Sequence, residues 1–361
     1  FTQKTAYEML RSLVGSEMCI RDSLNSYHQL RNYDYGIENR TNVSQISKYT
    51  SQRILYEFDI IEKLKKYDKK QKYTDEILWR IYWKGYLENY KSIWFEYINF
   101  KENSSNSYLI SSAMNGKTGI DCFDTWIEEL RENNYLHNHA RMWFASIWIF
   151  TLGLPWQLGA RLFMKHLLDG DAASNTLSWR WVAGMHTNKK PYLASKENIN
   201  KYTVNRFRDT PISISSKIKI IKHSQHQSNK LPVQRSFPNS NILIMFDNDM
   251  DIMNRSTLFN SYSKVYILHN MAINNEFDLS ENVSQFKRGL IDKINKLIPN
   301  SEVLKSTDLG INLSGHRFID VIYPGVGHNL DLINKFANQN QIIFNYIYSC
   351  LLYTSPSPRD S

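Results

Sequence analysis

The most informative segment of the chain reads Leu168-Asp-Gly-Asp-Ala-Ala-Ser-Asn-Thr-Leu-Ser-Trp-Arg-Trp181. It places two acids, Asp169 and Asp171, directly before a run with helical character. Within that run Asn175 and Trp179 stand four residues apart, so on a helix they share one face. One interpretation is a helical core in which the two acids cap a helix.

A second segment, Tyr135-Leu-His-Asn-His-Ala-Arg-Met142, lies upstream and also has a pair of residues at helical spacing. Asn138 and Arg141 stand three residues apart, and on a helix they also share a face. Both segments lie among Trp, Phe and Ile residues. A few polar groups that converge between apolar walls favour a pocket for a ring-shaped cofactor, which is the alternative to a plain core.

The amino-acid composition indicates how many domains the chain can form and which kinds of partner and site are favoured or excluded. The chain has 361 residues, of which 42% are hydrophobic, and this is enough for two domains with their own cores. Its net charge of +9 favours a polyanionic partner, and DNA, RNA and acidic lipid all fit that description. The three cysteines include no CxxC pair, which argues against a disulfide framework, a metal site and an iron-sulfur cluster.

The two ends of the chain need separate treatment. Residues 1–23 and 350–361 contain stretches that resemble translated sequencing-adapter sequence, and we exclude them from the fold argument. The longest apolar run, Met142 to Trp156, is shorter than the roughly 20 residues of a bilayer span, so it predicts a buried helix and no membrane anchor.

Tryptophan usage divides the remaining chain. All nine tryptophans lie between Trp79 and Trp181. Residues 24–205 predict a helical domain and residues 206–240, with prolines amid polar residues, a linker. Residues 241–349 predict a smaller, incomplete α/β domain with a parallel sheet, from apolar runs at Ile242–Phe246, Val265–His269 and Phe318–Tyr323.

Both predicted domains contain further stretches with a helical pattern. Apolar residues from Ile46 to Leu64 recur near a helical period, and Thr74 is expected to cap a helix that begins with acids. In the α/β region, Phe286, Leu290, Ile294 and Leu297 predict one apolar face of a helix.

These segments resemble the DNA photolyase and cryptochrome family in order and spacing from Lys117 through Trp181. The likeness extends upstream through Glu76-Ile-Leu-Trp-Arg80 and, more loosely, Asn42-Val-Ser-Gln-Ile-Ser47. It covers about half of the chain. It implies a mainly α domain, 24–205, that holds FAD in a folded, U-shaped conformation.

The resemblance assigns cofactor roles residue by residue. It implies that the FAD diphosphate is bound at the stretch with Ser44 and Ser47, where Val43 replaces the hydroxyl of the family's first position. It also implies that Asp171 accepts a hydrogen bond from the isoalloxazine and that Asn175 faces its N5. The resulting set of cofactor-binding residues is Ser44, Ile46, Ser47, Arg80, Arg141, Asp169, Asp171 and Asn175, with Arg141 and Asp169 as a buried ion pair.

On the DNA side, the resemblance places Glu76, Asn138 and Met142 around a lesion, with Trp79 and Trp181 as stacking walls. His139 stands where many members carry an arginine, which implies weaker or pH-dependent phosphate contact. For electron transfer, Trp179 and Trp156 match the first two tryptophans of a relay. The third has no counterpart near residues 103–107, and Trp94, Tyr97, Phe100 and Tyr108 are the candidates for an outer donor.

The α/β region resembles the family's antenna domain only weakly, and it follows the catalytic domain as in a permuted photolyase-like subgroup. Whether a second chromophore binds is left open. We expect a light-dependent lyase that splits cyclobutane pyrimidine dimers in UV-damaged DNA, as a cytoplasmic, nucleoid-associated monomer with no metal. The alternatives are a cryptochrome-type photoreceptor and a DNA-binding protein that has lost its flavin.

Overall fold

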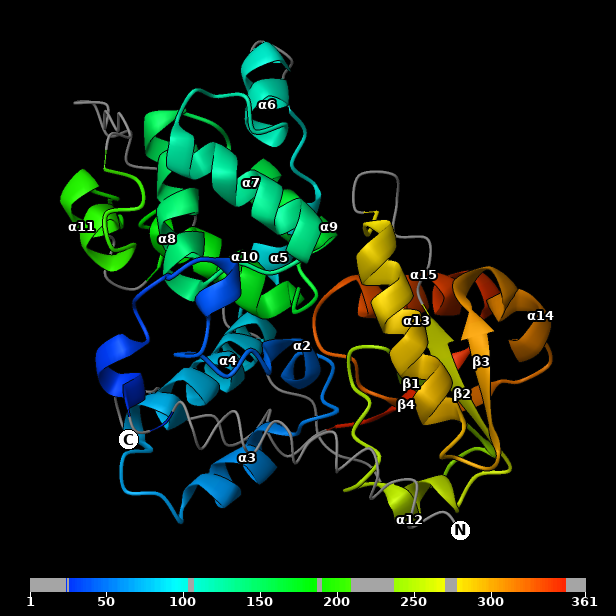
Figure 1. The fold of residues 1–361 in the computed structure, drawn as a ribbon. Coiled ribbons are helices and arrows are strands. Elements are labelled where there is room, and N and C mark those ends of the chain that lie inside the picture. Colours follow the sequence, from blue (N-terminus) through cyan, green and yellow to red (C-terminus); the bar gives the residue numbers. More distant parts are fainter. Residues whose placement is uncertain are drawn as a thin grey trace.

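The computed structural model describes residues 24, 26–102, 107–186, 190–208, 237–269 and 278–348. It shows a helical body and, beside it, a five-stranded sheet with its covering helices (Figure 1). Helices precede the sheet along the chain. The predicted fold class, a mainly α domain followed by a smaller α/β domain, is therefore confirmed.

The helical body is built on a core that contains most of the tryptophans. Its helices are η1 (Ile37–Asn39), α2 (Ser47–Thr50), α3 (Glu57–Leu64), α4 (Gln71–Asn89), α5 (Ser92–Ile98), α6 (Ser107–Met114), α7 (Asp121–Asn133), α8 (Asn138–Ser146), the π-helix η3 (Ile147–Thr151), α9 (Trp156–His166), α10 (Ala172–Val182) and α11 (Lys196–Tyr202).

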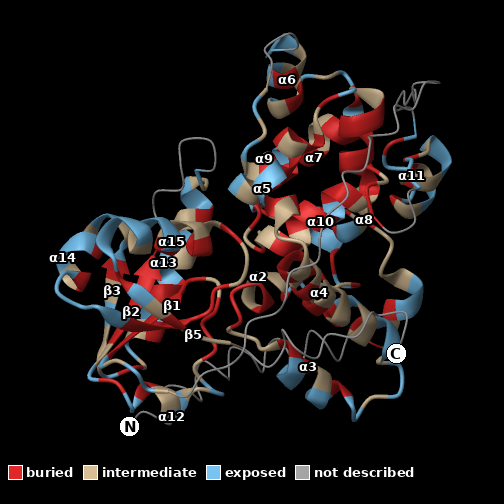
Figure 2. Ribbon diagram, turned by 180° about the vertical axis from the view of Figure 1, so that it is seen from behind, coloured by how far each residue is buried: buried red, intermediate tan, exposed pale blue. Residues whose placement is uncertain are grey.

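The α/β body has a wholly parallel sheet in the order β3-β2-β1-β4-β5. Its elements are β1 (Ile242–Phe246), α12 (Ser256–Phe259), β2 (Lys264–His269), α13 (Glu281–Asn295), β3 (Ser301–Lys305), η4 (Ser306–Asp308), α14 (Leu309–Leu313), β4 (Phe318–Ile322), α15 (His328–Asn340) and β5 (Ile343–Ile347). Helix α13 packs on one face of the sheet, and α14 and α15 pack on the other. Figure 2 shows the central strands, β1, β2 and β4, largely buried between these layers.

Several sequence predictions need correction. The apolar period from Ile46 to Leu64 is not one helix, because turns at residues 51–56 separate α2 from α3. Thr74 does not cap α4, since this helix begins at Gln71; there the Gln71 side chain donates a hydrogen bond to Asp75 across one turn. The helix predicted from Met142 to Trp156 ends at Thr151.

The strands were predicted in part. β1 begins and ends as predicted, and β2 and β4 agree to within one residue. The edge strands β3 and β5 were missed because each carries polar or half-buried residues that give no continuous apolar run. Helix α13 does turn Leu290 and Ile294 to the core, but Leu297 lies beyond its end.

Most of the predicted linker, residues 206–240, lies outside the described residues, and the domain boundary stays a prediction. Among the described helices, none combines the length and the apolar composition that a membrane span requires.

Candidate functional site

A cavity of about 400 Å³ opens into the helical body between α4, α8, α9 and α10. Most of the residues singled out from the sequence line it. They are Glu76, Trp79, Arg80, Asn138, Arg141, Met142, Asp169, Asp171, Asn175, Trp179 and Trp181. The structure thus brings together three segments that are separated by up to about a hundred residues in the chain.

A second cavity of about 220 Å³ adjoins the first. Ser44, Ile46 and Ser47 line it, together with Tyr73 and Tyr135. Five residues line both cavities and form their common wall: Glu76, Arg80, Asn138, Arg141 and Asp169. We call these two adjoining cavities, which share a wall, the two lobes of the site: the serine-bearing segment borders one, and the aromatic walls border the other.

An ion pair stands in this common wall. Arg141 Nη2 lies 3.0 Å from Asp169 Oδ2, and only 4% of the Asp169 side chain is exposed. Burial by itself raises the pKa of Asp169, but Arg141, with further help from Arg80, outweighs it and holds the pKa below its usual value. The carboxylate is therefore ionised at neutral pH and fixes the end of α8 to the segment before α10.

Asp171 combines the two interpretations of the sequence. It is the N-cap residue of α10, and its Oδ1 accepts a hydrogen bond of 2.7 Å from the Ser174 amide. It also lines the larger cavity. Burial disfavours its charge, but Lys84 and Arg80 reverse that effect and lower its pKa. The side-chain amide of Asn175, one turn along α10, donates to the Ala160 carbonyl at 2.8 Å.

The segment expected to bind a diphosphate is irregular. Gln45 has a left-handed backbone with φ of 52°, and Ser44 Oγ lies 2.6 Å from the Tyr73 hydroxyl. Helix α2 has only four residues, so its dipole contributes little to the binding of a charged group. Ile46 is buried and packs its side chain into a small apolar cluster.

Aromatic residues form the sides of the larger cavity. Trp79 lies 5.2 Å from Trp83, measured between ring centroids, and Trp181 stacks on Tyr192 at 5.7 Å. Trp179 is fully buried and packs edge-on against Phe163 at 5.1 Å. Glu76 and Asn138 are exposed, so they stand where the cavity meets solvent.

The histidines next to Asn138 face elsewhere. His137 is fully buried as the N-cap residue of α8, and burial lowers its pKa to about 4. His139 stacks on Trp143, its Nδ1 lies 2.9 Å from the Asn32 carbonyl, and burial lowers its pKa as well. His139 is therefore neutral at physiological pH, and neither histidine is among the residues that line the two cavities.

Trp156 is the one predicted site residue that lies outside both cavities. It begins α9 and stacks on Tyr97, with ring centroids 5.5 Å apart and planes inclined by 19°. Tyr97 in turn contacts Trp94 at 5.5 Å. Of the other outer candidates, Tyr108 is 84% exposed on α6. The aromatic contacts thus continue from Trp156 toward Tyr97 and Trp94.

Some residues of the larger cavity carry buried polar atoms without a hydrogen-bond partner. Among the described residues they include Arg80 Nη1, Ser174 Oγ and Trp179 Nε1, all from residues that line the larger cavity. Leaving such a group unpaired costs roughly 1 to 3 kcal/mol, so a polar ligand that pairs with them fits the site. A flat aromatic ring with a polar edge, joined to a diphosphate, matches the two lobes.

Sequence reasoning missed several lining residues. Trp83 lies one helical turn after Trp79 on α4, and this spacing was a usable signal. The Tyr135 ring contacts two guanidinium groups, with Arg40 at 4.9 Å and Arg141 at 5.3 Å from its ring centroid. No sequence pattern predicts that Arg40 contacts the Tyr135 ring, because Arg40 comes from a distant segment. Within the described ranges, no group of His, Cys, Asp and Glu side chains is arranged to hold a metal ion.

The sequence and the structure of this chain were compared with those of known proteins. Residues 73–210 match the family model for the FAD binding domain of DNA photolyase. The deoxyribodipyrimidine photo-lyase of Buchnera aphidicola is 32% identical over 139 residues, which is 37% of this chain and 28% of the relative. That of Thermus thermophilus is 31% identical over 131 residues, which is 34% of this chain and 30% of the relative.

The matched stretch thus spans less than a third of either relative's length. Among solved structures, a bacterial class III photolyase from Agrobacterium tumefaciens matches with a TM-score of 0.45 and 21% identity, covering 54% of this chain and 44% of that one. A cryptochrome from Synechocystis matches with a TM-score of 0.46 and 22% identity, covering 54% and 42%. Over residues 73–210 the helical body is thus similar to the FAD binding domain of DNA photolyase, and parts of it are similar to curated deoxyribodipyrimidine photo-lyases.

Proposed function

We propose that this protein binds FAD across the two joined cavities and uses blue light to split cyclobutane pyrimidine dimers in DNA. The observation that carries the proposal is the common wall. There the Arg141–Asp169 ion pair separates a lobe with serine hydroxyls from a lobe with aromatic walls. A dinucleotide with a flat ring at one end needs both environments side by side.

The residues take the following parts. Ser44 and Ser47 address the diphosphate, and Arg80 supplies positive charge between the lobes. Asp171 and Asn175 address the polar edge of the isoalloxazine in the larger lobe. When bound, FAD supplies an electron donor that visible light excites, and the protein's own side chains orient it and exclude water from it.

The DNA lesion enters at the mouth of the larger cavity. Trp79 and Trp181 offer apolar walls for unstacked bases, which offset part of the few kcal/mol that base flipping costs. Glu76, Asn138 and Met142 stand around the opening. We place the same residues around the lesion that the family resemblance assigned to it.

The chemistry at the mouth favours the cyclobutane dimer over the (6-4) photoproduct. Family members that repair the latter place histidines at the positions of Asn138 and Met142, where proton transfer is needed. An amide and a thioether do not transfer protons at neutral pH. The neighbouring His137 and His139 are held by buried contacts and do not replace them.

Absorption spectra and a repair assay test the proposal. We expect the purified protein to carry FAD and to repair cyclobutane dimers under blue light. Asp171→Asn keeps a good helix cap while it removes the charge, and we expect it to weaken FAD binding strongly. Asp121→Asn alters an exposed acid in the first turn of α7 and serves as the control.

Each result has a distinct meaning. Full retention of FAD by Asp171→Asn shows that the assignment of this acid is wrong. A yellow protein that repairs no dimer is a photoreceptor of cryptochrome type. A colourless protein that still binds DNA has lost the flavin, and turnover of (6-4) lesions alone overturns the choice of lesion.

A further inference from the structure

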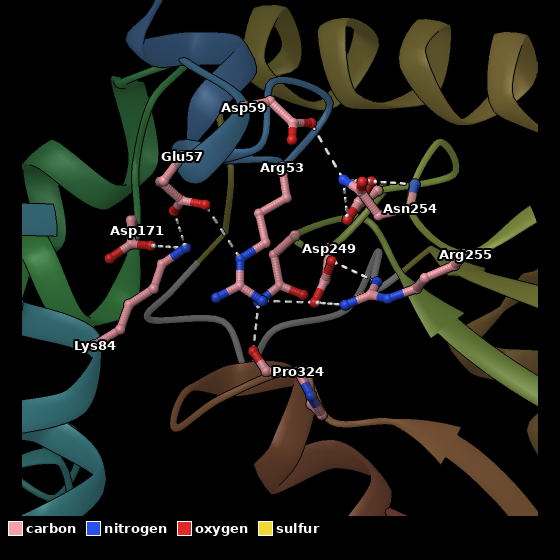
Figure 3. A network of polar contacts seen from close by, with 11 residues as sticks. Arg53, Glu57, Asp59, Lys84, Asp171, Asp249, Asn254, Arg255 and Pro324 are labelled. Carbon is pink, nitrogen blue, oxygen red and sulfur yellow. Dashed lines mark hydrogen bonds and ion pairs between the residues drawn. The ribbon is translucent and has the colours of Figure 1, made fainter. Parts of the chain in front are cut away.

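A row of alternating charges runs from the larger cavity into the α/β body (Figure 3). It consists of six residues that alternate between anion and cation, in the order Asp171, Lys84, Glu57, Arg53, Asp249 and Arg255. The first four belong to the helical body and the last two to the segment that follows β1. No sequence motif singled out this row.

At the cavity end, Lys84 joins two acids. Its Nζ lies 3.1 Å from Glu57 Oε1 and 3.9 Å from Asp171 Oδ2. The side chain of Glu57 is fully buried, and that of Lys84 is 17% exposed. Lys84 therefore shares its charge between the acid that lines the cavity and the acid that faces the other body.

At the other end, Asp249 joins two guanidinium groups. Arg53 Nη1 lies 2.7 Å from Asp249 Oδ2, and Arg255 contacts both carboxylate oxygens at 2.7 and 3.1 Å. Arg53 Nε lies 3.7 Å from Glu57 Oε2, which completes the row. The Gln52 carbonyl beside it accepts a hydrogen bond from the Met250 amide at 2.9 Å.

The backbone of Arg53 is strained to reach this position. Its φ is 52°, in the left-handed region that costs a non-glycine residue about 1 kcal/mol or more. Buried ion pairs are also often no more stabilising than apolar side chains of the same size. A strained residue at the centre of a buried charged row therefore suggests a role beyond fold stability.

The acids in the row are ionised at neutral pH. Burial raises the pKa of Glu57, but Lys84 and Arg53 more than offset it, so its pKa lies below the usual value. Burial also opposes the charge of Asp249, and there Arg255 and Arg53 lower the pKa well below the usual range. The row thus carries three negative and three positive charges, and its net charge is zero.

We propose that Lys84, Glu57 and Arg53 are positioning residues that couple Asp249, in the α/β body, to the electrostatic field at Asp171, and so set the preference of the cavity for reduced over oxidised flavin. The inference rests on the proposed function above. Through this row the α/β body acts on the flavin site by charge, independently of any second chromophore.

The sign of each effect follows from the order of the charges. Reduction adds electrons to the flavin, so a more positive surrounding favours the reduced form. Lys84→Met removes the cation next to Asp171. We expect the ratio of the affinities for reduced and oxidised FAD to fall by about tenfold.

Removing an acid has the opposite effect. Glu57→Gln removes one of the two acids that Lys84 contacts, so Lys84 neutralises Asp171 more fully. We expect the ratio of the affinities for reduced and oxidised FAD to rise. Asp249→Asn removes one of the two acids that Arg53 contacts, so Arg53 interacts more strongly with Glu57. Glu57 then neutralises less of the positive charge of Lys84. We expect a smaller rise of about threefold, because Asp249 lies further from the cavity.

The experiment is a redox titration of bound FAD in each variant, which reports the affinity ratio directly. Damage to the fold alone weakens both forms together and leaves the ratio unchanged. The matched control is Asp59→Asn, the same chemical change at the edge of the same interface, where exposed Asp59 contacts Asn254 at 3.1 Å. Solvent screens this charge, and we expect no shift.

A paired variant guards against poor folding of the single ones. Arg53→Met with Asp249→Asn removes one charge of each sign, and we expect the ratio to return toward that of the unmodified protein. Equal ratios in Lys84→Met, Asp249→Asn and the unmodified protein overturn the coupling, as does a shift in Asp59→Asn as large as that in Asp249→Asn. Failure of the unmodified protein to bind FAD instead overturns the proposed function.

Discussion

At the scale of single residues, the site depends on the ion pair between Arg141 and Asp169. Arg141→Met removes the ion-pair partner of the buried Asp169 carboxylate. We expect it to lower the free energy of unfolding by roughly 3 to 5 kcal/mol. Arg31→Met is the control, because the Arg31–Glu76 pair spans 3.6 Å and the Glu76 side chain is 42% exposed. That pair is worth about 0 to 1 kcal/mol.

The same pair predicts a pH dependence. Arg141 holds the folded-state pKa of Asp169 below its unfolded value of about 3.9, so the pair stabilises the protein above that value and loses its effect as the pH falls through the folded pKa. Denaturant unfolding at several pH values should therefore show the gap between Arg141→Met and the unmodified protein narrowing below about pH 4. A gap that stays constant into acid would contradict the assignment.

Single aromatic residues test the electron relay. Trp179 lines the cavity and Trp156 stacks on the fully buried Tyr97, so Tyr97 is the next aromatic side chain beyond Trp156. We expect light-driven reduction of bound FAD, with an external thiol, to be lost in Trp179→Phe and slowed in Trp156→Phe and Tyr97→Phe. Tyr108→Phe changes an exposed residue and should behave as the unmodified protein. Normal reduction in Trp179→Phe would exclude the relay.

At the scale of elements, the close approach of α9 and α10 positions Trp179. A Cβ atom built on Gly159 of α9 would lie 2.2 Å from the Trp179 ring, so only glycine fits there. We expect Gly159→Ala to cost about 1 to 3 kcal/mol of stability and to weaken FAD binding, because the ring must move.

Helix α13 supplies the matched control for that change. A Cβ on Gly289 meets nothing within 4 Å, so Gly289→Ala should stabilise the protein by up to about 1 kcal/mol. Thermal unfolding of both variants checks the pair. Equal stability of Gly159→Ala and the unmodified protein would show that α9 and α10 can separate without loss.

At the scale of the whole molecule, the proposed binding of DNA depends on net charge. The excess of lysine and arginine that gives +9 must reach phosphates if DNA is the partner. With roughly 3 to 5 phosphate contacts on duplex DNA, the logarithm of the affinity should fall with the logarithm of salt concentration by about 0.9 per contact. Fluorescence titrations with duplex DNA at salt concentrations from about 50 to about 200 mM measure this slope. A flat response would remove DNA as a partner.

The contacts between the two bodies also belong to this scale. Glu88 of α4 accepts hydrogen bonds from the Tyr323 hydroxyl and the Val326 amide, at 2.8 and 2.7 Å. Trp94 donates to Asp331 of α15 at 2.8 Å. These bonds attach the helical body to the segment after β4 and to the first turn of α15, at the carboxyl end of the sheet, where α/β folds commonly bind ligands.

The sequence by itself determined the class of the fold and most of the site. Helical spacing in α8 and α10 placed Asn138 with Arg141 and Asn175 with Trp179, since residues three or four apart share a helix face whatever surrounds them. Continuous apolar runs likewise marked β1, β2 and β4, because strands buried on both faces leave no polar alternation.

Only the tertiary structure decided the rest. The two-lobed cavity, the stacking of Trp156 on Tyr97 and the row from Asp171 to Asp249 join residues that are far apart in the chain. A lone lysine or arginine, such as Lys84 or Arg53, has the same local signature on a solvated surface as in a buried network. Its role depends on which distant charge the fold brings within a few ångströms, and local periodicity carries no information about that distance.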